Sequence, residues 1–185
     1  MANTPSNMLA LGTKAPFFEL PNPVKNNELQ SLEDLKGSKG TLVIFMCNHC
    51  PFVIHVIEKL AELYEDYKGK GIEFIAINSN DVINYPADSP EQMVDFAEEK
   101  GFTFPYLYDE SQAVAKAYDA ACTPDFYFFD DKLDLIYRGQ MDDSRPGNNK
   151  EITGEDLVIA FENLLAGQPQ EELQRASLDC NIKWK

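Results

Sequence analysis

A pair of cysteines separated by two residues constrains this chain more than any other feature. Cys47 and Cys50 follow residues 41–45, TLVIF, a continuous β-branched and aromatic run that is typical of a strand buried on both faces. From Val53 to Tyr67, apolar residues recur at spacings of three and four, which predicts a helix with one apolar face. The chain therefore places two thiols between a buried strand and a helix, a junction that belongs to α/β folds.

The rest of the pattern predicts a mixed central β-sheet flanked by α-helices. A second apolar strand at residues 72–77 follows the helix, so the two strands are expected to be parallel. A hairpin over residues 125–137 would supply the antiparallel strands. We also expect an edge strand within residues 15–23, a strand at 106–108, and helices after Ser31, from Ser89 to Gly101, at 111–118, and from a Thr153-Gly154 cap to Gly167.

The length of 185 residues predicts one domain, with a core over about residues 12–167 and a tail at 168–185 that shows no clear period. Hydrophobic residues make up 44% and charged residues 25% of the chain, which is ordinary for a protein with a packed core. Nothing in the pattern predicts an oligomeric state.

The charge and the N-terminus exclude several classes of function. A formal net charge of −15 repels phosphate backbones and anionic lipids, so we expect neither nucleic acid nor a membrane as a partner. The first residues lack the basic start and apolar stretch of a secretory signal, and no run reaches the about 18 apolar residues of a membrane span. We therefore expect a cytoplasmic protein, in which four cysteines are more typical of catalysis or metal binding than of a disulfide scaffold.

The position of the two thiols suits redox chemistry. At a helix N-terminus, free N–H groups and the helix dipole favour a thiolate, so we expect Cys47 to have a lowered pKa and to act as the nucleophile. Cys50, one turn later, is expected to close a disulfide with Cys47 and release the partner. His49, between the two thiols, would add positive charge or a hydrogen bond and lower the thiol pKa further; the alternative is a solvated His in a turn.

Two other interpretations of the cysteine pair stay open. The pair could be half of a zinc site, with its other ligands from Cys122, Cys180 or a histidine, but the sequence has no second Cys-X-X-Cys. It could also be a structural turn without chemistry. We predict no metal and no bound cofactor, because dithiol chemistry requires neither.

The segments FMCNHCPF and CTPDFYFFD resemble the thioredoxin superfamily. GTKAPFFEL with SLEDLKGSKGTLVIF looks like the N-terminal signature of its alkyl hydroperoxide reductase and thiol-specific antioxidant branch, so the chain resembles a peroxiredoxin-like member with a Cys-X-X-Cys motif. The resemblance covers residues 12–167 and implies a thioredoxin-like fold with an N-terminal extension. It also implies that Thr123-Pro124 is a cis bond facing the motif and that Pro124 shapes the substrate groove.

This sequence departs from the pattern in places that bear on its activity. TLVIF contains no counterpart of the buried thioredoxin Asp. Cys47 stands where typical peroxiredoxins have Thr, and Pro124 stands about where they have a peroxide-binding Arg. Arg138 and Arg145 are the candidate substitutes for that Arg, although each is better explained as a surface charge.

We therefore predict a thiol–disulfide oxidoreductase that acts on protein or small-molecule disulfides through a Cys47–Cys50 couple. The alternatives are a peroxidase that uses Cys50 as its peroxidatic thiol and a non-enzymatic binding domain. Cys122, two residues before Pro124, is a candidate extra redox thiol or a packed core residue. Cys180, in a tail without a predicted core role, is a candidate resolving thiol that a flexible segment would deliver.

Overall fold

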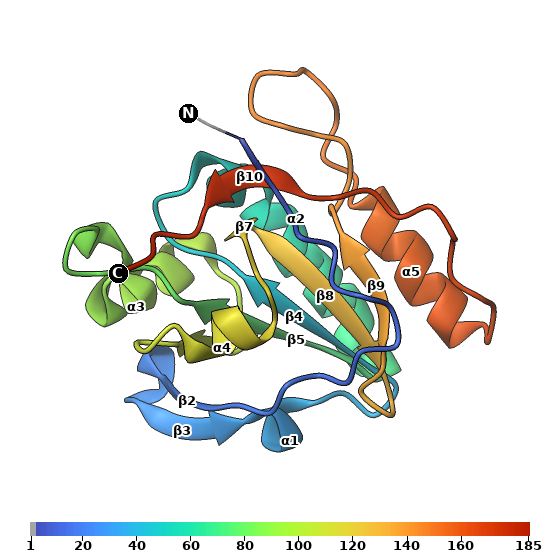
Figure 1. The fold of residues 1–185 in the computed structure, drawn as a ribbon, viewed down its shortest axis with the longest axis horizontal. Coiled ribbons are helices and arrows are strands. Elements are labelled where there is room, and N and C mark those ends of the chain that lie inside the picture. Colours follow the sequence, from blue (N-terminus) through green and yellow to red (C-terminus); the bar gives the residue numbers. More distant parts are fainter. Residues whose placement is uncertain (1–2) are drawn as a thin grey trace.

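A computed structural model describes residues 3–185 and contains a five-stranded sheet at its centre. The strand order is β6-β5-β4-β8-β9, in which β4, β5 and β6 are parallel and β8 and β9 are antiparallel to their neighbours (Figure 1). The strands are β1 (Thr4–Pro5), β2 (Glu19–Asn22), β3 (Glu28–Ser31), β4 (Gly40–Phe45), β5 (Ile72–Asn78), β6 (Tyr106–Tyr108), β7 (Cys122–Thr123), β8 (Asp125–Asp130), β9 (Leu135–Gly139) and β10 (Leu178–Asn181). The helices are α1 (Leu32–Leu35), α2 (Pro51–Tyr67), α3 (Pro90–Lys100), α4 (Ala113–Ala117) and α5 (Glu155–Leu165).

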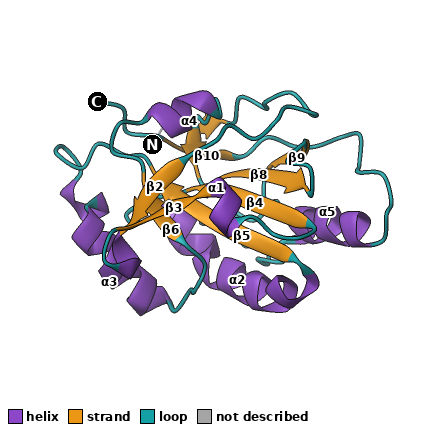
Figure 2. Ribbon diagram, turned by 90° about the horizontal axis from the view of Figure 1, so that it is seen from below, coloured by secondary structure: helices purple, strands orange, loops and turns teal. Residues whose placement is uncertain are grey.

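The sheet separates two hydrophobic cores, because successive strand residues point to opposite faces. Leu42 and Ile44 of β4 face one core, which the apolar sides of α2, α3 and α5 complete. Val43 and Phe45 face the other core, in which α1, α4 and the N-terminal segment provide the cover. Figure 2 shows α2, α3 and α5 together on one side of the sheet and α4 on the other. Burial on both faces explains why the sequence of β4 is apolar without alternation.

The central elements confirm the predicted order, and the thioredoxin-like architecture is present with its N-terminal extension. Within that extension, β2 pairs with β3 in a separate two-stranded hairpin, which the sequence pattern did not predict. The last helix begins at the predicted Thr153-Gly154 cap. Gly154 occupies the N-cap position at φ 69°, and the Thr153 hydroxyl accepts a hydrogen bond from Glu155 N at 3.2 Å.

The C-terminal tail is part of the fold, which corrects the prediction of a segment without a core role. β10 lies between β1 and β7 in a three-stranded antiparallel sheet (Figure 1). Ile182 donates its N–H to Ala121 O at 3.1 Å and buries its side chain in the core that also contains Phe45. Lys183 N donates to Asn80 Oδ1 at 2.8 Å, and Leu178 and Asp179 pair with β1, so the segment is anchored on both sides of Cys180.

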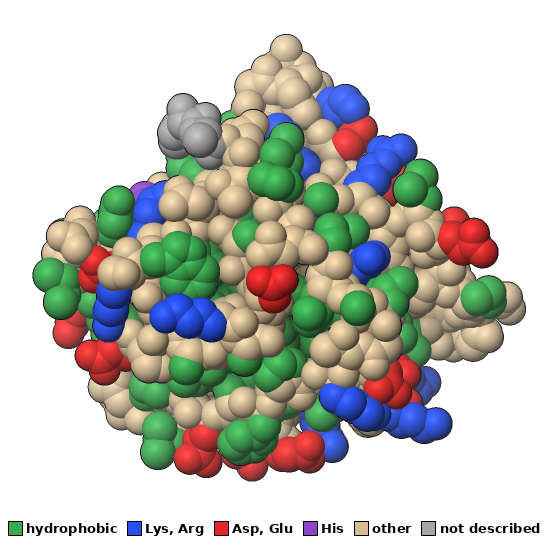
Figure 3. Space-filling model, viewed as in Figure 1, with side chains coloured by type: hydrophobic (Ala, Val, Ile, Leu, Met, Phe, Trp, Pro, Cys, Tyr) green, Lys and Arg blue, Asp and Glu red, His purple; other side chains and the backbone are tan. Residues whose placement is uncertain are grey.

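On the face drawn in Figure 3, acidic and basic side chains are interspersed between patches of hydrophobic and uncharged surface. Within residues 3–185, no helix is both long enough and apolar enough to cross a membrane.

Anchoring of the tail predicts a large effect of a single C-terminal substitution. Ile182 is 1% exposed, so Ile182→Ala should lower the free energy of unfolding by about 2–5 kcal/mol through lost burial and a residual cavity. Urea unfolding followed by circular dichroism measures this change. Leu178→Ala is the matched control in the same segment, because Leu178 is 40% exposed and its truncation should cost about 0.5 kcal/mol or less. Equal and small effects of both substitutions would show that the tail does not contribute to the core.

Candidate active site

The register of β4 against β8 brings the cysteine motif beside the segment that contains Pro124. Phe45, the last residue of β4, is paired with Asp125, the first residue of β8. The residues that follow Phe45 and those that precede Asp125 therefore leave the sheet at the same edge. The Thr123–Pro124 peptide bond is cis, as predicted.

Thr123 contacts both thiols of the motif. Its hydroxyl oxygen lies 3.7 Å from the Sγ atom of Cys47. Its carbonyl oxygen lies 3.2 Å from the Sγ atom of Cys50, whose thiol donates to it when protonated. Both cysteines are buried, and together with Val53 they belong to the core that underlies α2. The structure thus brings together four of the predicted site residues: Cys47, Cys50, Thr123 and Pro124.

The thiol with the lowered pKa is Cys50, which corrects the prediction for Cys47. Helix α2 begins at Pro51, so Cys50 is the N-cap residue and Cys47 lies outside the helix. A hydrogen bond with Cys47 lowers the pKa of Cys50 to about 5, with further contributions from Cys180 and from the Val53 N–H, against the opposing effect of burial. The pKa of Cys47 is raised by its hydrogen bond to Cys50, by burial and by the negative charge of Asp88. The first proton lost from the pair therefore leaves its charge mainly on Cys50.

Asp88 is the centre of a buried hydrogen-bond network beneath the motif. Its Oδ1 atom accepts from the backbone N–H groups of Asn48 at 2.8 Å and His49 at 3.2 Å. Its Oδ2 atom lies 2.6 Å from His49 Nδ1 and accepts from Asn80 Nδ2 at 2.8 Å. The ring of His49 also stacks on Tyr85, with centroids 5.7 Å apart. His49 is thus directed at a carboxylate, and the prediction that it tunes the thiols stays a prediction.

The contribution of the His49–Asp88 pair to the stability of the folded state depends on pH. The hydrogen bond to Asp88 raises the pKa of His49 above 6.5. Burial would raise the pKa of Asp88, but the hydrogen bonds from His49 and Asn80 outweigh it and lower that pKa below 3.8. The pair therefore stabilises the folded state fully between the unfolded-state pKa values, 3.8 and 6.5, and this contribution declines as the pH rises through the raised pKa of His49.

One atom each of Cys47, His49 and Asp88 lie within 4.8 Å of one another, which is the arrangement a metal site would need. The His49 Nδ1 and Asp88 Oδ2 atoms are 2.6 Å apart, however. Tetrahedral zinc with N and O ligands at about 2.0 Å would hold them about 3.3 Å apart. The present geometry is that of a hydrogen-bonded pair.

Two further buried carboxylates lie near the thiols, and sequence analysis identified neither. Burial raises the pKa of Asp125 to about 7, and its Oδ1 atom has no hydrogen-bond partner among residues 3–185. Burial likewise raises the pKa of Asp179 to about 8, with the guanidinium of Arg145 4.0 Å away opposing the shift. The charge of Cys50 contributes to the raised pKa of Asp179, so protonation of this acid and of the thiol are linked.

The two remaining cysteines have different positions. Cys122 is buried beside Pro124, and burial raises the pKa of its thiol strongly, which fits a packed residue. Cys180 is half-buried, is paired with Thr123 across β7 and β10, and packs against the core that contains Cys47 and Cys50. A rigid strand, and not a flexible tail, holds Cys180 at the site.

The two arginines considered as peroxide ligands have other partners. Arg138 donates to Leu9 O and to Gln174 Oε1, both at 2.8 Å. Arg145 donates to backbone oxygens of Asp142 and Ser144. The hydrogen bonds of both guanidiniums thus hold loops in place.

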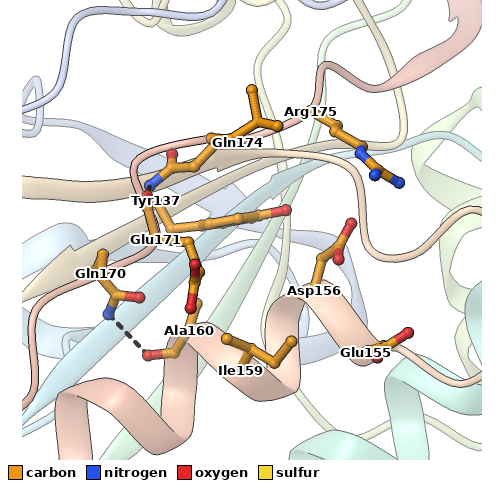
Figure 4. Close-up of a pocket in the computed structure, with 10 residues that line it drawn as sticks. Tyr137, Glu155, Asp156, Ile159, Ala160, Gln170, Glu171, Gln174 and Arg175 are labelled. Carbon is orange, nitrogen blue, oxygen red and sulfur yellow. Dashed lines mark hydrogen bonds between the residues drawn. The ribbon is translucent and has the colours of Figure 1, made fainter.

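A hollow of about 350 Å³ lies between α5 and the segment of residues 170–175 (Figure 4). Tyr137 and Asp156 line it, and Gln170 closes one end through a 2.8 Å hydrogen bond to Ala160 O. None of the predicted site residues lines this hollow.

Two of the residues that sequence analysis missed show a signal in the sequence, an acid beside apolar residues. Asp125 opens the otherwise apolar strand FYFF, and Asp179 precedes Cys180. Asp88 gives a weaker signal, because it lies 38 positions from Cys50 in a polar loop.

Removal of the Asp88 charge should change the titration of both neighbours. In Asp88→Asn, the pKa of His49 should fall because its charged partner is lost, and the pKa of Cys47 should fall because a nearby negative charge is lost. The His49 ring protons, followed by NMR against pH, measure the first change.

Asp81→Asn is the matched control for this titration. Asp81 is also buried and lies in the same loop, but its carboxylate bonds to Ile83 N and Asn84. An unchanged His49 midpoint in Asp88→Asn, or an equal decrease in both variants, would contradict the assignment of the pair.

Comparisons with known proteins agree with this geometry. The chain is 32% identical over 127 residues to the thiol-disulfide oxidoreductase ResA of Geobacillus kaustophilus, a match that spans 69% of this chain and 67% of that protein. It is 55% identical in sequence to an uncharacterized conserved protein from Geobacillus kaustophilus. The crystal structure of that protein matches with a TM-score of 0.97 over 100% of this chain and 97% of the other.

A structure titled as a DsbE-type thiol:disulfide interchange protein from Chlorobium tepidum shares the fold, with a TM-score of 0.68 at 21% identity over 85% of this chain and 99% of that one. The family model described as Redoxin matches residues 10–157, which is most of the chain. This match and the fold agree, and the chain belongs to the Redoxin family.

Proposed function

We propose that this protein is a thiol–disulfide oxidoreductase that cycles between a Cys47–Cys50 dithiol and a Cys47–Cys50 disulfide. The observation that carries the proposal is the contact of both thiols with Thr123, which holds the two sulfurs side by side next to Pro124. The likeness to thiol-disulfide oxidoreductases supports it.

The hydrogen bond between the two thiols lets a proton pass from Cys47 to Cys50, which makes Cys47 the nucleophilic thiolate. At neutral pH the pair has lost one proton, and the charge rests mainly on Cys50. Transfer of the Cys47 proton to Cys50 moves the thiolate to Cys47, which attacks one sulfur of a substrate disulfide and expels the other as a thiolate. Cys50 then loses its proton and attacks the Cys47 sulfur, which forms the Cys47–Cys50 disulfide and releases the second substrate thiolate. Two electrons pass from the dithiol to the substrate.

Protein disulfides are the substrate class that the surroundings of the motif favour. The loop that carries Asp88 also presents Ile83, which is 82% exposed, and Tyr85, which stacks on His49. Exposed apolar side chains beside a reactive pair suit contact with a polypeptide. The cytoplasmic location remains a prediction from the sequence.

A peroxidase is the second candidate, because the lowered pKa of Cys50 also suits a peroxidatic thiol. The hydrogen bonds of Arg138 and Arg145 go to other groups, which favours slow peroxide consumption.

Insulin reduction with dithiothreitol as the electron donor tests the proposal. Cys47→Ser and Cys50→Ser should each reduce the rate to that of dithiothreitol alone, because each removes one half of the couple. Cys122→Ser, which changes a buried thiol that donates to Pro124 O, should keep most of the activity and serves as the matched control.

Trapping of the intermediate identifies the nucleophile. Cys50→Ser should accumulate a mixed disulfide between Cys47 and insulin, because the resolving thiol is absent. Trapping only through Cys50 in Cys47→Ser would reverse the two roles. Retention of the wild-type rate by Cys47→Ser would refute the dithiol mechanism. A fast reaction with hydrogen peroxide that survives Cys47→Ser but not Cys50→Ser would support the peroxidase instead.

A further inference from the structure

Cys180 lies at the site although it is 130 positions from Cys50 in the sequence. Its partner across the strands is Thr123, the residue that contacts both thiols of the motif. Directly opposed residues of antiparallel strands have their Cα atoms roughly 4.5–5.5 Å apart. The thiols of Cys180 and Cys50 are close enough for each to shift the pKa of the other, and Cys180 packs against the core that contains Cys50. Cys50 therefore has a thiol neighbour on each side, Cys47 and Cys180.

The three thiols differ in their access to solvent. Cys47 and Cys50 are buried, whereas Cys180 is half-buried. The strand that carries Cys180 is fixed by β1 on one side and by β7 on the other. This placement gives the buried sulfur of Cys50 a neighbour that a reductant can approach from solution.

We propose that Cys180 is a third redox thiol, which can replace Cys47 as the disulfide partner of Cys50. The inference builds on the Cys47–Cys50 couple of the proposed function. In the oxidised protein, the Cys180 thiolate attacks Cys50 Sγ, the Cys50–Cys180 bond forms, and the Cys47–Cys50 bond breaks. The electron pair of the broken bond stays on the Cys47 sulfur, which takes up the proton that Cys180 has lost. The exchange needs no external oxidant or reductant, and it leaves Cys47 free as a thiol in an oxidised protein.

The reduced and oxidised states differ in whether Cys50, the neighbour of Cys180, is charged. In the reduced protein, burial and then the neighbouring Cys50 raise the pKa of Cys180 to about 12, so Cys180 stays a protonated thiol at neutral pH. Formation of the Cys47–Cys50 disulfide removes the charge of Cys50 and with it two causes of the raised pKa. Ionisation of Cys180 thus becomes easier in the state in which the exchange takes place.

Disulfide mapping of the full-length Cys47→Ser variant tests the inference. The variant is oxidised with diamide, which takes two electrons from a pair of thiols, and is then alkylated and digested with trypsin. Trypsin releases residues 40–59, which contain Cys50, and residues 176–183, which contain Cys180. We expect these two peptides to be joined in more than half of the molecules, and Cys47→Ser/Cys122→Ser should give the same product.

Cys50→Ser is the matched control, because it retains Cys47 and Cys180 but lacks the thiol between them. We expect at least a several-fold lower yield of the joined peptides from this variant. Equal yields would overturn the inference, since they would show unselective collision of the tail with the motif. Wild-type protein equilibrated in a glutathione buffer provides a measurement without substitution, and it should contain the joined peptides as one of two disulfide forms.

Free, alkylated Cys180 in both Cys47→Ser and the wild type would also overturn the inference. Its failure is distinguishable from that of the proposed function. If the wild type reduces insulin but forms no disulfide with Cys180, the proposed function stands and the inference fails. If a Cys50–Cys180 disulfide forms but insulin is not reduced, the inference stands and the proposed function fails.

Discussion

The antiparallel pairing of β4 with β8 is the constraint on which the site depends. Phe45 is paired with Asp125, so the chain that leaves β4 toward Cys47 and the chain that enters β8 from Thr123 meet at one edge of the sheet. A shift of one residue would turn every apolar side chain of β4 to the opposite core, so burial on both faces fixes this register. The contacts of Thr123 with the thiols follow from it.

Sequence alone predicted the elements whose burial creates a strong pattern. The apolar run of β4 and the periodic face of α2 identified the strand–cysteine–helix junction. β10 escaped prediction because it has only four residues, and its stability comes from pairing with β1 and β7, which no local pattern records. For the same reason, the sequence identified Cys180 as a candidate but assigned it to a flexible tail. Asp88 escaped because its importance lies in contacts with distant residues, Asn48 and His49.

The pKa of Cys50 is lowered first by its hydrogen bond with Cys47, and the start of α2 adds to this effect. Because Pro51 opens the helix, Cys50 takes the N-cap position, close to the first free N–H groups, while Cys47 lies nearer the carboxylate of Asp88. The sequence located the helix, but the hydrogen bond between the thiols, which leaves the charge mainly on Cys50, has no counterpart in the sequence pattern. Buried acids at Asp125 and Asp179, with pKa values of about 7 and about 8, add proton-binding groups to the same region.

The reduction potential of the Cys47–Cys50 couple tests the central claim most directly. The wild type is equilibrated in buffers of defined thiol–disulfide potential, and the remaining free thiols are counted by alkylation and mass spectrometry. The account predicts one reversible transition with a slope of about 30 mV per tenfold change, as for two electrons, and its loss in the double variant Cys47→Ser/Cys50→Ser. Thiols that stay fully reduced across the whole range, or a transition that persists in the double variant, would contradict the account.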